Sequence, residues 1–300
     1  MEHTLIKFLR VTYFIWLFSI NHTFAGIQPN QGTDTFNTVL FRISFVESKH
    51  VSFLFGTHHA FGKEFFDSLF YANQALRSCE LLIKENINVP GAMAGDLINH
   101  RTPTLKWKNY LGKEDLGFIN SLFATSPTDF RKMTPAELYV FLNRYYKQQI
   151  CLKKGPDDTS LSLDDYIGML ATEQNIELLG LETTEEQIHL INMDVEGMPR
   201  KSHKRRLANI IEKIRLKKTN DCGEIKWYSQ MHMNYQLDAP CRNNLVLTDR
   251  NDKWIKTIID QIERNNCFIA VGLSHLMYEC GLIQQLRKLG YIITPIMVND

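Results

Sequence analysis

The feature that most constrains the fold of this chain is a series of short, continuous apolar runs separated by segments with helical periodicity. Parallel strands that are buried on both faces produce such runs, and a helix must follow each strand before the next one can pair. Strands are predicted at residues 41–46, 51–55, 81–84, 176–181, 267–271 and 291–298. Helices are predicted at residues 63–77, 134–149, 163–174, 184–193, 249–263 and 282–289. We therefore expect an α/β fold with a central mixed, largely parallel sheet flanked by helices, and a helical insertion at about residues 88–160.

The composition is that of a folded domain and argues against nucleic acid as the partner. Lys and Arg number 34 against 33 Asp and Glu, and the formal net charge of +1 produces no strong long-range field. With 44% hydrophobic and 22% charged residues, disordered and low-complexity classes are excluded.

Residues 200–218 are the exception to this charge balance, with nine basic residues and a single acid, Glu212. We interpret the segment as a solvated helix face whose inner side carries Leu207, Ile210, Ile211 and Ile214. The alternative is a membrane-surface or polyanion site.

The first 25 residues have the layout of a secretory signal peptide. Lys7 and Arg10 precede an apolar run at residues 11–20, and small residues precede Gly26, where cleavage is expected. Ten apolar residues are too few for a helix to cross a bilayer. Cleavage leaves 32 basic and 32 acidic residues, so the mature protein is neutral. We predict an exported protein, periplasmic or secreted, with no stable membrane span and with one α/β domain at residues 26–300.

Six cysteines remain after this cleavage, and none forms a CxxC pair of the kind found in zinc knuckles or thioredoxin-type sites. An oxidising compartment permits up to three disulfides. Cys222 and Cys241 bracket a polar stretch, predicted as a loop at residues 218–246, and are the favoured pair. The alternative is buried free thiols, because Cys79 and Cys267 lie beside or within apolar strands.

Two units of the chain share one pattern: a strand, Gly-x-x-His, a glycine, a helix and a strand. The first contains Gly56 to His59, and the second contains Gly272 to His275. Each glycine lies where a strand turns sharply, a position that can require positive φ or a close backbone approach. Each histidine then follows the carboxyl end of a strand.

The carboxyl ends of the predicted strands deliver ionisable side chains to the edge of the sheet where ligands of open α/β folds bind. The residues that follow these ends are His58, His59, Glu85, Glu182 and His275. Imidazole and carboxylate together are typical ligands of a hydrolytic metal site, in which a bound water has a lowered pKa.

The order of several motifs resembles that of the TraB/GumN family, which also contains the animal Tiki proteases that trim Wnt proteins. The matching segments are LFGTHH, IKEN, GLETTEEQ, DRNDKW and AVGLSHLMYECGLIQQLRKLGY, from about residue 40 to 298. The resemblance implies a divalent-metal-dependent peptidase centre. It also implies a fold related to erythromycin esterase and to a haem-binding lipoprotein group.

Matched motif by motif, the family histidines correspond to His59 and His275, and the family glutamate to Glu85. Gly-Leu-Glu-Thr corresponds to residues 180–183, which include Glu182, and the Arg-Asn pair to Arg250 and Asn251. His58 stands where the family usually has an apolar residue, so either neighbouring imidazole can face the site. Asp164 also matches a family acid, although its place at a helix start favours an electrostatic cap.

Each of these residues also has a purely structural interpretation. The histidines can be buried residues bonded to backbone carbonyls, and Glu85 can cap the following turn. Glu182 lies before a helix whose amino terminus favours an acid, and Arg250 can pair with a nearby carboxylate.

The resemblance and the residues together predict metal-assisted hydrolysis of an amide bond in a peptide or protein. His59 and His275 are the expected ligands of a divalent ion, with Glu85 as third ligand or general base. Mn, Co, Fe and Zn all suit this donor set. Arg250 is expected to stabilise the oxyanion or hold a substrate carboxylate, and Glu182 to orient a ligand imidazole. Asn251 completes the predicted catalytic set.

Two other classes of function remain open. One is a metal-free, esterase-like hydrolase in which a histidine activates water while Glu85 holds its tautomer. The other is a non-catalytic protein that binds a peptide, a metal or haem.

Overall fold

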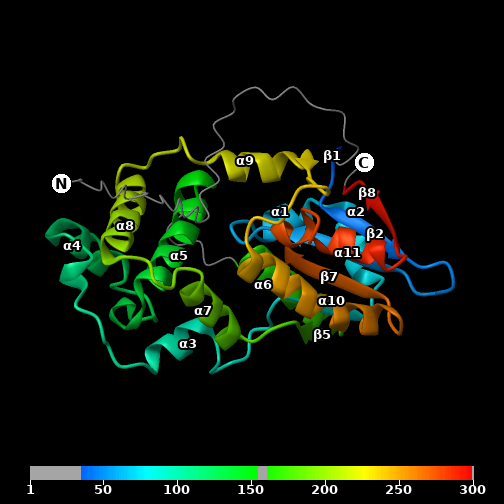
Figure 1. The fold of residues 1–300 in the computed structure, drawn as a ribbon, viewed down its shortest axis with the longest axis horizontal. Coiled ribbons are helices and arrows are strands. Elements are labelled where there is room, and N and C mark those ends of the chain that lie inside the picture. Colours follow the sequence, from blue (N-terminus) through cyan, green and yellow to red (C-terminus); the bar gives the residue numbers. More distant parts are fainter. Residues whose placement is uncertain (1–34, 155–160, 299–300) are drawn as a thin grey trace, which may run out of the picture. The chain divides into compact units, whose positions relative to one another are not determined.

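A computed structural model describes residues 35–154 and 161–298, and the predicted signal peptide lies outside these residues. The main sheet of the described residues has the strand order β5-β4-β7-β3-β2-β8 (Figure 1). Its strands are β2 (Leu40–Ser44), β3 (Ser52–Thr57), β4 (Leu81–Lys84), β5 (Glu177–Gly180), β7 (Cys267–Gly272) and β8 (Ile292–Ile296). β5, β4, β7 and β3 are parallel, whereas β2 is antiparallel to both β3 and β8. The predicted α/β fold with a mixed, largely parallel sheet is confirmed.

Helices flank this sheet: α6 contacts β4 and β5, α2 contacts β3, and α10 crosses in front of β7 in Figure 1. The α-helices are α1 (Lys63–Asp67), α2 (Phe70–Arg77), α3 (Ala94–Asn99), α4 (Lys113–Leu122), α5 (Pro135–Tyr145), α6 (Leu163–Glu173), α7 (Thr184–Met193), α8 (Arg200–Arg215), α9 (Gly223–Gln230), α10 (Asp249–Ile262) and α11 (Leu282–Lys288). Shorter elements are η1 (Trp107–Asn109), η2 (Phe130–Lys132), η3 (Tyr146–Cys151), η4 (Asn244–Thr248), η5 (Leu273–Leu276) and the paired strands β1 (Thr35–Phe36) and β6 (Met233–Asn234). No helix in the described ranges is long and apolar enough to cross a membrane.

Local sequence signals account for several helix boundaries. α5 begins at a complete capping box, in which Thr134 accepts from the Glu137 N–H and the Glu137 carboxylate accepts from the Thr134 N–H. The helix predicted at 63–77 is divided into α1 and α2, because the fully buried Leu69 has a non-helical ψ of 82°. Burial of this side chain thus outweighs the continuous helical pattern.

Two hydrophobic cores hold the described chain together. The first surrounds the sheet and includes Leu54, Ile83 and Ile269. The second lies among helices, where Leu142 of α5 belongs to the same buried cluster as Ile211 of α8. The second core therefore combines helices from two parts of the chain. α5 lies between β4 and β5, whereas α8 follows β5, so the helices between β4 and β5 need α8 to complete this core. The four inward residues predicted for α8 are all buried.

The prediction of an irregular loop at residues 218–246 is wrong, because α9 and β6 lie within it. Two buried tyrosines anchor this segment to the sheet: Tyr228 donates to the Gly56 carbonyl, and Tyr235 donates to the Thr38 carbonyl, each at 2.7 Å. The elements are short, and long-range contacts stabilise them. Their sequence therefore carries little periodicity.

The predicted Cys222–Cys241 disulfide is also wrong. The structure pairs Cys151 with Cys222 and Cys241 with Cys280, so each bond joins the 218–246 segment to a more distant part of the chain. Closeness in the sequence did not predict the pairing, because α9 begins directly after Cys222 and leads the chain away from it before Cys241. Cys79 and Cys267 are free and buried, as the alternative interpretation predicted.

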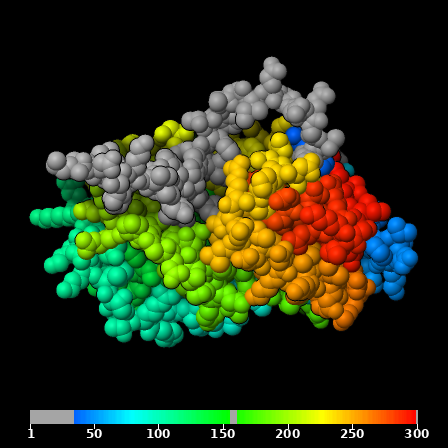
Figure 2. Space-filling view, viewed as in Figure 1, coloured from blue at the N-terminus to red at the C-terminus, as the bar shows by residue number. Residues whose placement is uncertain are grey.

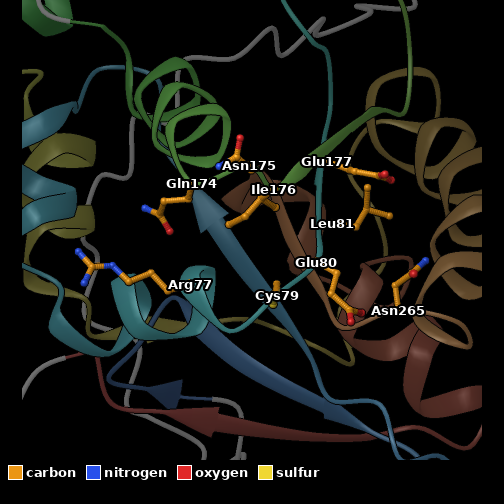
Figure 3. A pocket seen from close by; sticks show the side chains of 9 residues that line it. All are labelled: Arg77, Cys79, Glu80, Leu81, Gln174, Asn175, Ile176, Glu177 and Asn265. Atoms are coloured by element: carbon orange, nitrogen blue, oxygen red, sulfur yellow. The ribbon is translucent and has the colours of Figure 1, made fainter.

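The described cavities lie away from the predicted site. One of about 490 Å³ opens where β4 and β5 begin, at the amino-terminal edge of the parallel strands (Figure 3). Its lining residues are Arg77, Cys79, Glu80, Leu81, Gln174, Asn175, Ile176, Glu177 and Asn265. A second, of about 670 Å³, lies beside the 44–50 turn, where Phe45 contacts Tyr291; Figure 2 shows this blue turn beside the C-terminal segment in red. No predicted site residue lines either cavity.

Candidate active site

The carboxyl ends of the four parallel strands supply the candidate site. Thr57 at the end of β3 is in register with Gly272 at the end of β7, and Lys84 at the end of β4 is in register with Gly180 at the end of β5. The residues that follow these ends therefore leave the same edge of the sheet, as the sequence predicts. They are His58, His59, Glu85, Glu182 and His275.

His275 is buried and held in one tautomer. Its Nδ1 lies 2.7 Å from the Asn251 Oδ1, while the Asn251 amide donates to the carbonyls of His275 and Cys280 at 3.3 and 2.9 Å. Because these two carbonyls fix the amide NH₂, the Asn251 Oδ1 is the acceptor and His275 Nδ1 carries the proton. Burial lowers the pKa of His275 to about 3, so its Nε2 presents a lone pair at neutral pH.

Arg250 connects the buried groups of the site. Its Nη1 lies 3.0 Å from His275 Nε2 and its Nη2 lies 2.7 Å from Glu85 Oε2, while its Nε and Nη2 both donate to Glu182. Its guanidinium also lies over the Trp254 ring, 4.5 Å from the centroid. Burial lowers the pKa of Arg250, but the two carboxylates outweigh this effect and raise it. The guanidinium is thus engaged with internal partners, in agreement with the ion-pair interpretation of this residue.

Glu182 contacts Arg250 and Gln187. The Gln187 amide donates to the Glu182 Oε1 at 3.0 Å. We expected Glu182 to contact a ligand imidazole. Its carboxylate instead accepts from Arg250 and from Gln187, so it orients the guanidinium.

Glu85 lies between the backbone of β7 and Arg250. Its Oε1 accepts from the Gly272 N–H at 2.7 Å and lies 3.8 Å from His275 Nε2. Burial favours a raised pKa, but the positive charges of Arg250 and His59 and the Gly272 N–H outweigh it and lower the pKa of Glu85. A Cβ at Gly272 would lie only 3.0 Å from this Oε1, so the motif glycine is required for a close approach and not for positive φ.

His59 forms a second pair on the other side of the edge. Its Nδ1 lies 2.7 Å from Asp164 Oδ2, and the other Asp164 oxygen accepts from the Thr57 hydroxyl at 2.6 Å. The His59 side chain is 58% exposed, whereas that of Asp164 is 13% exposed. The negative charge of Asp164 raises the pKa of His59 to about 9, against the opposing effect of desolvation. Burial works to raise the pKa of Asp164, but His59 and Thr57 outweigh it and hold this pKa far below its usual value.

His58 points toward α9. Its Nε2 lies 2.9 Å from Glu224 Oε1, and its ring contacts Phe61 and Tyr228. Burial lowers the pKa of His58 in spite of the Glu224 carboxylate. His59, in contrast, interacts electrostatically with both Glu85 and His275.

The sequence reasoning assigned no role in the site to two of the residues that the structure places there. Asp164 lies in the first turn of α6, as expected of a helix-start acid, but its side chain binds His59 and Thr57. Its match to a family acid was the signal that could have identified it. The ring centroids of Trp254 and His275 lie 4.4 Å apart. Trp254 follows Arg250 by one turn of α10, but this spacing is too common in helices to have identified it from the sequence.

The donor groups fit a divalent metal by type and orientation. Both His59 and His275 have Nδ1 held by an oxygen, which is how metal-binding imidazoles are usually oriented, and Glu85 supplies a carboxylate. Within the part of the chain that is described, no three His, Cys, Asp or Glu side chains are close enough to hold an ion. Arg250 supplies the positive charge between Glu85 and His275, so a metal would have to compete with it.

A mixed sheet whose parallel carboxyl edge carries two oriented imidazoles and a buried Arg–Glu cluster defines an α/β protein with a polar centre at that edge. The sequence profile of the TraB/PrgY/gumN family matches residues 39–295, and the chain belongs to this family. No curated protein and no solved structure matches the chain. The expected fold relation to erythromycin esterase stays a prediction.

Proposed function

We propose that this protein is an exported peptidase that hydrolyses amide bonds at the carboxyl edge of its sheet. The observation that carries the proposal is the pair of imidazoles from the two Gly-x-x-His motifs. An oxygen of Asp164 or Asn251 holds each Nδ1, so Nε2 is the ring nitrogen that each histidine turns toward other groups. That of His275 faces Arg250 Nη1. Family membership supports the same assignment.

His59 and His275 would be the ligands of a divalent ion, with Glu85 as third ligand or general base, and Mn, Co, Fe and Zn all suit these donors. When bound, such an ion would polarise the scissile carbonyl and lower the pKa of a water molecule. His275 already presents an Nε2 lone pair, whereas His59 must first lose the proton that Asp164 stabilises. Arg250 lies against the His275 Nε2, so an ion would compete with the guanidinium for the lone pair.

The roles of the remaining groups follow from their contacts. As the general base, the Glu85 carboxylate, which is ionised because its pKa is lowered, would accept the proton of the attacking water. Arg250 donates to the carbonyl oxygen as negative charge develops there, while Glu182 and Gln187 keep the guanidinium in place. Asn251 maintains the tautomer of His275.

A metal-free hydrolase is the second candidate, and the His59–Asp164 pair favours it. An exposed imidazole whose Nδ1 donates to a buried carboxylate has the arrangement of an oriented acid–base catalyst. Asp164, and not Glu85 as expected from the sequence, holds this tautomer. With a pKa of about 9, His59 is protonated at neutral pH and serves as the acid that protonates the leaving amine.

The test is cleavage of a peptide library by the mature, untagged protein, read by mass spectrometry, with the metal content measured by ICP-MS. His59→Ala and His275→Ala are compared with His189→Ala, which changes an exposed histidine of α7. The proposal expects cleavage by the wild type and by the His189 variant, and its loss in the other two while circular dichroism stays native.

Chelation separates the two candidates. Loss of cleavage on exhaustive chelation, with stoichiometric metal in the wild type and none in the His59 and His275 variants, supports the metal-dependent peptidase. Cleavage that survives chelation supports the metal-free hydrolase. Tight peptide, metal or haem binding without any cleaved fragment overturns both in favour of a binding protein.

A further inference from the structure

We propose that the amino-terminal half of α8 is a docking surface for an anionic lipid membrane. Arg200, Lys201, Lys204 and Arg205 occupy the first two turns of this helix and are all exposed. The first turn contains no acid, although the amino terminus of a helix carries partial positive charge and favours negative side chains. Four cations therefore gather where the helix itself repels them.

The other half of the same helix is neutralised internally. Lys213 pairs with Asp221 at 2.5 Å, and Arg215 lies 3.6 and 3.5 Å from Glu114 and Asp115. Just beyond the helix, Lys218 pairs with Glu212 at 2.5 Å. Across the described residues, no acid pairs with the four cations at the amino-terminal end, and the closest preceding acid in the sequence is the exposed Glu196. The positive charge of this end is thus left for an external anion.

Packing makes this charged face rigid. The opposite face of α8 is buried through Leu207, Ile210, Ile211 and Ile214, and Figure 1 shows the helix beside α5. Arg206 is held over the Tyr139 ring, 4.0 Å from its centroid, which fixes the boundary between the two faces. At 100° per residue, the four exposed cations cover an arc of about 140° on one side of the helix. They form a broad face on a fixed helix.

The chemistry of this face suits the headgroups of an anionic bilayer. Clusters of four or more Lys and Arg on an amphipathic helix attract anionic lipids, and this attraction acts only within about a Debye length. The chain as a whole is close to neutral, so it lacks the long-range field that steers proteins to nucleic acid.

Flotation of the full chain with vesicles tests the proposal. Vesicles of phosphatidylcholine alone are compared with vesicles of equal parts phosphatidylcholine and phosphatidylglycerol. We expect binding to the anionic vesicles that is about tenfold tighter and that weakens as salt is raised. Lys201→Glu with Arg205→Glu should abolish this preference, whereas the matched pair Lys49→Glu with Lys256→Glu, exposed lysines elsewhere on the chain, should keep it.

Three outcomes overturn the proposal: equal binding to neutral and anionic vesicles, an equal loss in both double variants, or retention on heparin or DNA without vesicle binding. The last of these would assign the face to a soluble polyanion. Circular dichroism and thermal unfolding verify that each variant is folded. If the Glu variants unfold, Lys201→Gln with Arg205→Gln replaces them and should lose most of the preference for anionic vesicles.

Discussion

The Nδ1 of His275 and the side-chain oxygen of Asn251 lie 2.7 Å apart, and this contact determines which nitrogen of the histidine carries the proton. Asn251 is completely buried and also donates to the Cys280 carbonyl, so its amide has a single allowed orientation. An adjacent pair in the sequence, Arg250 and Asn251, therefore controls both nitrogens of one imidazole.

Replacing Asn251 by Leu should release His275 from this tautomer. The carbonyls of His275 and Cys280 lose their donor, and we expect a loss of about 1–3 kcal/mol in the free energy of unfolding. Activity or metal affinity should fall by about 10- to 100-fold, as for other groups that orient a ligand histidine. Denaturant unfolding and metal titration measure the two effects. An unchanged affinity would show that the tautomer of His275 has no role in the site.

The His59–Asp164 pair should make stability depend on pH. The pKa of His59 is raised from 6.5 to about 9, so the pair stabilises fully below pH 6.5 and its contribution is lost as the pH rises through 9. Because His59 is largely exposed, we expect only about 0.5–1 kcal/mol. NMR titration of wild type and Asp164→Asn is the measurement. The variant should return the pKa of His59 toward its usual value, and an unshifted His59 titration would refute the coupling.

Low pH should also weaken the His59–Asp164 pair, because it protonates the carboxylate of Asp164. The pKa of Asp164 is lowered, so its contribution is present above its usual value of 3.8 and is lost as the pH falls further. Unfolding experiments below pH 4 should show wild type and Asp164→Asn converging in stability. A difference that persists or grows in acid would contradict this expectation.

Removing Arg250 should destabilise the fold as well as the site. Arg250→Met leaves Glu85 and Glu182 buried without their cation, which we expect to cost about 3–5 kcal/mol. Adding Glu85→Gln and Glu182→Gln should recover much of this loss, since no buried charge then remains. Arg264→Met, which breaks an exposed ion pair with Asp260, is the control and should cost under about 1 kcal/mol. Equal losses in the two single variants would argue against a buried charge cluster.

Gly272→Ala tests the close approach between β7 and Glu85. The new Cβ would lie 3.0 Å from the Glu85 Oε1, so the carboxylate must move and activity should fall, with a stability cost of about 1–3 kcal/mol. Gly117→Ala in α4 is the matched control, since its Cβ meets nothing within 4 Å, and should stabilise by up to about 1 kcal/mol. Full activity in Gly272→Ala would show that Glu85 is not held for function.

The sequence alone determined most of the elements of this fold and the edge of the sheet that carries the site. The β4 strand occurs at Leu81–Lys84 as predicted, and the two Gly-x-x-His motifs follow β3 and β7. These features are local: burial on both faces of a strand selects apolar runs, and the helical period selects the segments between them. Polar residues directly after an apolar run then indicate where the strand ends.

Only the tertiary structure decided which partner each of these residues takes. His59 binds Asp164, which lies 105 positions later in the chain, and Glu85 binds Arg250, 165 positions later. The same holds for the disulfides and for α9, whose buried Tyr228 donates to the Gly56 carbonyl 172 positions away. Such contacts depend on strand register and on how helices pack on the sheet. Local periodicity contains neither, so the sequence placed these residues at the ends of strands and helices but did not determine the connections between them.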